Sequence, residues 1–130
     1  MCLLDAVARW DADRISCVSR THRDPDNPMR AAGRLPALCG VEYAAQAMAV
    51  HGALTDALPG RPRAGYLASI RDVVCRVDRL DAGEGDLIVE AERLMGDDHH
   101  AVYRFSLRMQ ETELLSGRAT VALDAGRSRP

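Results

Sequence analysis

One segment of the chain has the composition of a long helix, and its apolar residues are not confined to one face. Small residues of high helix propensity dominate residues 37–58, which predicts a helix of about six turns. Pro36 suits the start of this helix, and Pro59, Gly60 and Pro62 end it. A helix that is apolar on almost every side must be surrounded by other structure. The rest of the chain is therefore expected to wrap around it.

After this helix the sequence has the patterns of extended strands. Apolar residues alternate with mostly polar ones from Ala101 to Gln110, which is typical of a half-buried strand. Similar but shorter patterns cover residues 87–92 and 119–123, and an apolar strand is expected over Tyr66–Val77. Turn residues separate these strands, at 81–85, 96–98 and, more weakly, 111–113.

The residues before the helix predict a hairpin and then a long loop. Two short strands, Ala6–Trp10 and Arg14–Ser19, flank the turn-like Asp11-Ala12-Asp13. Residues Thr21 to Leu35 contain two prolines and a glycine, so regular structure is not expected there. Long loops in compact domains are often functional.

This order of elements predicts an α+β fold in which an antiparallel sheet curls around a single central helix, the hot-dog fold. The 130 residues are enough for one core, so residues 1–124 are expected to form one domain and residues 125–130 a disordered tail. No segment reads as a signal peptide or membrane span, so a cytoplasmic protein is expected.

Charge and composition exclude several classes of function. The formal net charge of -2 makes nucleic acid an unexpected partner. All 17 basic residues are arginine, which excludes Schiff-base chemistry on a lysine. The four cysteines are widely scattered, without the spacing of a zinc site, and are expected to be reduced and mostly in the core. No metal or other cofactor is expected.

Glu42 is an acidic residue in the first turns of an otherwise apolar helix. A buried carboxylate without a partner costs several kcal/mol, so Glu42 is either hydrogen-bonded, neutral or kept for a task. The alternative is that it faces solvent, where the helix dipole favours a negative charge. Gln46 lies one turn further along the helix and can share its face.

His22 is the other candidate, at the start of the long loop, although a single loop histidine is more often a surface residue. His51 is expected to pack or lie at an interface, and His99 and His100 to lie at an exposed turn. A histidine and a carboxylic acid together suit an elimination, in which one group removes a proton alpha to a thioester carbonyl and the other protonates the departing hydroxyl.

The segment Pro36-Ala-Leu-Cys-Gly-Val-Glu42-Tyr-Ala-Ala-Gln46 resembles the central-helix motif of the 3-hydroxyacyl-[acyl carrier protein] dehydratases. The stretches 20–28 and 35–40 are more similar still to the dehydratase-like proteins of aryl polyene clusters. The resemblance implies a hot-dog dimer in which His22 is the base and Glu42 the acid, contributed by opposite protomers. It also implies an acyl tunnel along the helix, with residues Ala37, Leu38, Gly40 and Gln46 on the substrate and a backbone N–H of Ala37 or Leu38 on its carbonyl.

The implied substrate is carried on the phosphopantetheine of an acyl carrier protein. Arginine suits phosphate and carboxylate recognition, so the arginines flanking the two ends of the helix are candidates for docking that carrier: Arg30, Arg34, Arg61 and Arg63. Cys39, near the helix start, is a weaker candidate for a nucleophile with a lowered thiol pKa.

Three functions remain open at this point. The first is dehydration of 3-hydroxyacyl thioesters to trans-2-enoyl thioesters in aryl polyene or related fatty-acyl biosynthesis. The second is a hot-dog thioesterase, in which Glu42 would activate water. The third is a non-catalytic partner subunit of a heteromeric dehydratase. Fold similarity alone does not decide among them.

Overall fold

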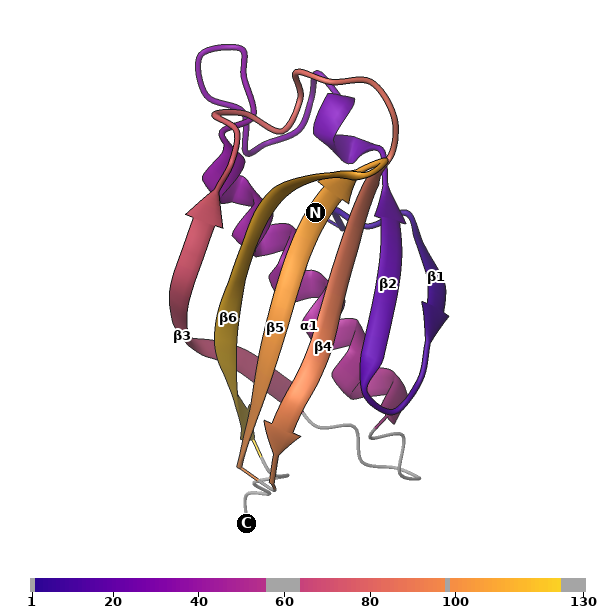
Figure 1. Ribbon diagram of the computed structural model, residues 1–130, viewed down its shortest axis with the longest axis vertical. Coiled ribbons are helices and arrows are strands. Elements are labelled where there is room, and N and C mark those ends of the chain that lie inside the picture. Colours follow the sequence, from indigo (N-terminus) through magenta and orange to yellow (C-terminus); the bar gives the residue numbers. More distant parts are fainter. Residues whose placement is uncertain (1, 56–63, 98, 125–130) are drawn as a thin grey trace.

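A computed structural model describes residues 2–55, 64–97 and 99–124. Six antiparallel strands form one sheet in the order β1-β2-β4-β5-β6-β3, and one helix crosses one face of it (Figure 1). The strands are β1 Ala6–Trp10, β2 Arg14–Ser19, β3 Ala64–Cys75, β4 Leu87–Gly96, β5 His100–Met109 and β6 Thr112–Asp124; the helices are η1 Thr21–Arg23, η2 Ala37–Cys39 and α1 Gly40–Thr55.

The predicted hairpin of β1 and β2 is confirmed at both of its strands. The Asp11 carboxylate accepts hydrogen bonds from the backbone N–H groups of Asp13 and Arg14, at 2.8 and 2.9 Å. This local bonding of an aspartate side chain is what makes the tripeptide a turn. The predicted helix is also present, but its first three residues form the 3-10 turn η2, and residues 56–58 lie outside the described part of the chain.

The bounds of two predicted strands differ from those in the structure. Strand β6 starts at Thr112, seven residues before the predicted strand, because a bulge opposite Leu107 and Arg108 breaks the alternation. The adjacent Leu114 and Leu115 are consequently both buried. Strand β3 spans residues 64–75 rather than 66–77.

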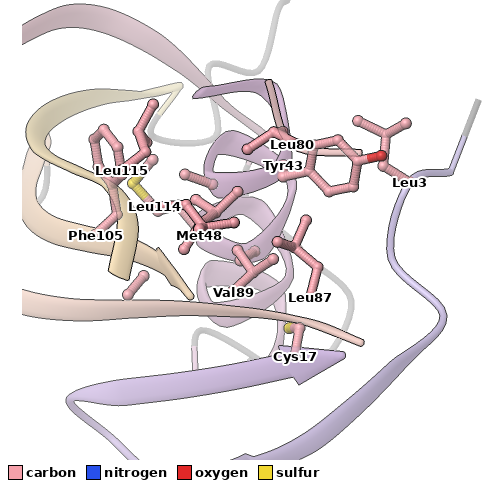
Figure 2. Close-up of a cluster of buried hydrophobic side chains, with 14 of the residues drawn as sticks. Leu3, Cys17, Tyr43, Met48, Leu80, Leu87, Val89, Phe105, Leu114 and Leu115 are labelled. Carbon is pink, nitrogen blue, oxygen red and sulfur yellow. The ribbon is translucent and has the colours of Figure 1, made fainter. Parts of the chain in front are cut away.

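The core lies between α1 and the inner face of the sheet. Figure 2 shows Tyr43 and Met48 of α1 among side chains from the strands, including Leu87 and Val89 of β4. Gly40 sits where α1 comes closest to β5, since a Cβ atom there would lie 2.9 Å from Leu107 Cδ2. The predicted hot-dog architecture, a sheet around one long helix, is what the structure shows.

One side of α1 is exposed in the part of the chain that the structure describes. We call this side the open face; its exposed residues are Leu38, Glu42, Ala49 and Ala53. Strand β3 is an edge of the sheet, and its Val74 is 44% exposed. Among the described residues, the prediction of a helix surrounded by other structure is therefore not met on the open face.

Candidate active site

His22 lies in η1, directly after β2, at the end of the sheet where the long loop meets the β3–β4 connection (Figure 1). We call this region, residues 21–35 and 76–86, the loop end. The His22 side chain is fully buried. Burial lowers its pKa, because the charged imidazolium loses solvation, and this favours the neutral ring.

The contacts of the His22 ring indicate which nitrogen carries the proton. Nε2 lies 3.1 Å from the carbonyl oxygen of Gly85. A carbonyl can only accept, so Nε2 is the protonated nitrogen and Nδ1 of the neutral ring holds a lone pair. Nδ1 is buried and has no hydrogen-bond partner among the described residues. The Nδ1 lone pair is therefore unused among the described residues.

Arg30 connects the two ends of the long loop. Its guanidinium donates to the carbonyl oxygens of Asp24 at 2.8 Å, His22 at 3.2 Å and Gly33 at 3.3 Å. Its Nη1 also donates to Asp81 Oδ2 at 2.8 Å, and the Arg30 side chain is 17% exposed. Arg30 is thus engaged within the chain, whereas Arg34, the second predicted docking residue, is exposed.

The Asp81 carboxylate is the centre of this bonding. It is 4% exposed, and besides Arg30 it accepts two bonds from Arg79, at 2.8 and 3.0 Å, and one from the N–H of Leu35. The Arg79 guanidinium and these other donors hold the pKa of Asp81 far below its usual range. The carboxylate therefore fixes the loop to the β3–β4 connection.

A second buried network fixes η1 to α1. The hydroxyl of Tyr43 lies 2.9 Å from Thr21 Oγ1 and accepts a 3.1 Å bond from Asn27 Nδ2. Asn27 also donates to the carbonyl of Thr21 at 2.9 Å. Because Tyr43 belongs to α1 and the other two to the loop, this network sets the position of His22 relative to the helix.

Glu42 lies in a different environment. It is exposed in the first turn of α1, and no hydrogen bond or ion pair engages it in the described part of the chain. The structure brings no contact between Glu42 and His22 within one chain. The resemblance assigns the two residues to opposite protomers.

Some of the predicted substrate-binding residues make hydrogen bonds or packing contacts within the chain. The N–H of Ala37 donates to the carbonyl of Asp78 at 3.0 Å, so this predicted donor is used within the chain, and Leu38 is 62% exposed. Gln46 Oε1 accepts a 2.7 Å bond from the N–H of Leu3. Gly40 is buried against Leu107.

The remaining histidines occupy the predicted places. His51 is buried, with Nδ1 2.7 Å from the Tyr103 hydroxyl and Nε2 2.9 Å from the Asp11 carbonyl oxygen, so both of its nitrogens are used. His99 and His100 are exposed. Arg61 and Arg63 lie outside the described residues.

The cysteine predictions need correction. The pKa of Cys39 is raised, first by burial and then by the nearby Glu42 carboxylate, which opposes the thiolate that a nucleophile requires. All four cysteines are free, as expected, but Cys2 and Cys75 are exposed rather than in the core.

Comparison with known proteins identifies the family. The family model described as ApeP dehydratase, of the ApeP-like family, matches residues 1–125. This chain belongs to the ApeP-like family. No curated protein matches it.

Solved structures place the same fold in dehydratases and thioesterases. A chain of the dehydratase heterocomplex ApeI:P from Xenorhabdus doucetiae is 23% identical, with a TM-score of 0.79 over 92% of this chain and 81% of that chain. A thioesterase from Haemophilus influenzae is 16% identical, with a TM-score of 0.66 over 90% of this chain and 76% of its own. The predicted family and the predicted hot-dog fold are both confirmed.

The sequence did not predict a role in the site for four residues: Asn27, Tyr43, Asp81 and Gly85. The sequence predicts Asp81 and Gly85 only as turn residues, and Gly85 has a positive φ of 111°. The partners of Asp81 and Gly85 are 51 and 63 residues away in the chain, so no local pattern could reveal them.

In the described part of the chain, no helix is long and apolar enough to span a membrane.

Proposed function

We propose that this chain dehydrates 3-hydroxyacyl thioesters on an acyl carrier protein, giving trans-2-enoyl thioesters for an aryl polyene or related fatty-acyl pathway. The observation that carries the proposal is the His22 ring, in a chain of the ApeP-like family. Burial lowers the pKa of the ring and favours its neutral form, in which Nε2 donates to the Gly85 carbonyl and the Nδ1 lone pair has no partner among the described residues.

The reaction needs one base and one acid. His22 Nδ1 removes the proton from the carbon next to the thioester carbonyl. The electron pair of that C–H bond forms the double bond between C2 and C3 as the bond between C3 and the hydroxyl oxygen breaks, and Glu42 from another subunit acts as the acid that protonates this oxygen, which leaves as water. The N–H of Leu38 polarises the thioester carbonyl. No cofactor takes part in these steps.

A second subunit is part of the proposal because Glu42 lies on the open face. The exposed apolar residues around it and the unpaired edge of β3 are features that another hot-dog chain would cover. Glu42 as the acid requires this partner to be a second copy of the chain, whereas the heterocomplex ApeI:P supports a different hot-dog dehydratase subunit as the partner. Arg34, exposed at the loop end, is a docking residue for the acyl carrier protein.

The test is a pair of substitutions assayed on a 3-hydroxyacyl carrier-protein substrate. His22→Gln keeps a nitrogen donor to the Gly85 carbonyl but removes the base, and Glu42→Gln removes the acid. Each is expected to lower turnover about 10²- to 10⁴-fold while the thermal unfolding temperature stays near that of the wild type. Wild-type turnover in both variants would exclude these roles.

Two other functions have specific support. The thioesterase neighbours share the fold, and release of free thiol by the wild-type chain would favour hydrolysis over elimination. The complete burial of the His22 ring favours a non-catalytic partner subunit. In that case dehydration by a mixed complex would persist with His22→Gln and stop only when the other subunit is altered.

A further inference from the structure

The β3–β4 connection holds His22 at two separate points. Gly85 accepts a hydrogen bond from the ring, at 3.1 Å. Asp81, four residues earlier, binds the Arg30 guanidinium, which donates to the His22 backbone carbonyl. One short segment thus contacts the ring of the proposed base directly and its backbone through Arg30.

The geometry points to Asp81 and Arg30 as positioning residues for His22, an inference that rests on the proposed function. Arg30 reaches three loop carbonyls at once because its planar guanidinium has five donors in fixed directions. Asp81 fixes the guanidinium itself with a 2.8 Å ion pair, in a place where its own side chain is 4% exposed. Neither residue touches the reacting atoms in this scheme.

The tautomer of the buried His22 ring depends on the position of the loop. The ring of His22 has one donor and one lone pair, and only the contact to Gly85 decides which nitrogen has which. If the loop shifts away from the β3–β4 connection, Nε2 loses that acceptor and the lone pair is no longer confined to Nδ1. An error of about 1 Å in such a group can lower turnover 10²-fold.

Asp81→Asn and Arg30→Lys are the variants that test this. Asp81→Asn removes the charge that fixes Arg30. Arg30→Lys keeps a cation for Asp81, but a compact ammonium group cannot reach the three carbonyls in the same way. Arg79→Gln is the matched control, because Arg79 binds the same carboxylate without contacting the loop carbonyls that Arg30 binds.

Two measurements are made on the complete assembly. Steady-state kinetics on a 3-hydroxyacyl carrier-protein substrate are expected to show kcat lower by about 10- to 100-fold in Asp81→Asn and Arg30→Lys, with KM within about threefold of the wild type. Nitrogen-15 NMR of the histidines is expected to show His22 protonated on Nε2 in the wild type and in Arg79→Gln. In the other two variants it should show a mixture of tautomers.

The outcomes separate the inference from the proposed function. Wild-type kcat and an unchanged His22 tautomer in Asp81→Asn and Arg30→Lys would overturn the positioning role. Full activity in Arg30→Lys would also overturn it, because an ion pair with Asp81 would then be enough to position His22 without the three carbonyl contacts. A wild-type protein without dehydratase activity would refute the proposed function, while the NMR comparison would still test whether Asp81 and Arg30 fix the ring.

Discussion

The loop end and the open face of this chain are built in opposite ways. At the loop end, polar groups are buried and bonded many times over, as the four donors on Asp81 illustrate. On the open face, apolar side chains such as Leu38 are exposed, and Glu42 has no partner among the described residues. The chain therefore completes the His22 half of the proposed site by itself and leaves the Glu42 half to be covered by another subunit.

The largest effect on stability is expected at the loop end. Asp81→Ala leaves the guanidinium groups of Arg30 and Arg79 without their shared carboxylate, and loss of a partner by such partly buried groups costs about 1 to 3 kcal/mol. Chemical denaturation at neutral pH measures this loss. Glu113→Ala is the control, because its pair with Arg76 is exposed and should contribute less than about 1 kcal/mol. Equal losses in both variants would mean that the loop end is not specially stabilised.

A substitution on the open face is expected to affect assembly and not the single chain. Ala49→Arg places a long charged side chain where a partner subunit would pack. Association should weaken by at least about 30-fold, or about 2 kcal/mol, while the free energy of unfolding of the single chain changes by less than about 0.5 kcal/mol. Sedimentation velocity across a concentration series measures the association.

Ala6→Arg is the matched control for this substitution. Ala6 is also exposed, but it lies in β1, the edge strand opposite β3 in the sheet order. It should assemble like the wild type. If Ala49→Arg also assembled like the wild type, the open face would not be the interface.

The smallest of these effects is the response to acid. The pKa of Asp81 is lowered in the folded chain, so its contribution to stability is present above the pKa of the unfolded state, near 4, and is lost as the pH falls below it. Unfolding free energies should therefore fall by about 1 kcal/mol or more between pH 5 and pH 3. Asp81→Asn should remove part of this slope; an identical slope in that variant would assign it to other carboxylates.

Local chemistry explains which parts of the fold the sequence could predict. The hairpin of β1 and β2 follows from the bonding of Asp11 to its own neighbours, and the start of the helix from Pro36. The early part of β6 was missed because its bulge at Leu114 depends on the partner strand. A pattern along one strand does not contain that pairing.

The candidate site was predictable only in part. The residue types and their order suggested His22 and Glu42, but the complete burial of His22 depends on contacts from residues about 60 positions later. The engagement of Arg30 by Asp81, across 51 residues, was likewise not predicted. Tertiary contacts of this length carry no periodic signal in a single sequence.

The central claim is that His22 and Glu42 of different subunits form one site. Mixing inactive His22→Gln with inactive Glu42→Gln tests it, after unfolding and refolding together so that the subunits exchange. In a dimer of identical chains, half of the mixed assemblies would contain both variants and one intact site each, which restores about a quarter of wild-type dehydratase activity. Activity that stays at the level of the separate variants, in mixtures shown by mass spectrometry to contain both chains, would contradict a site shared between two copies of this chain.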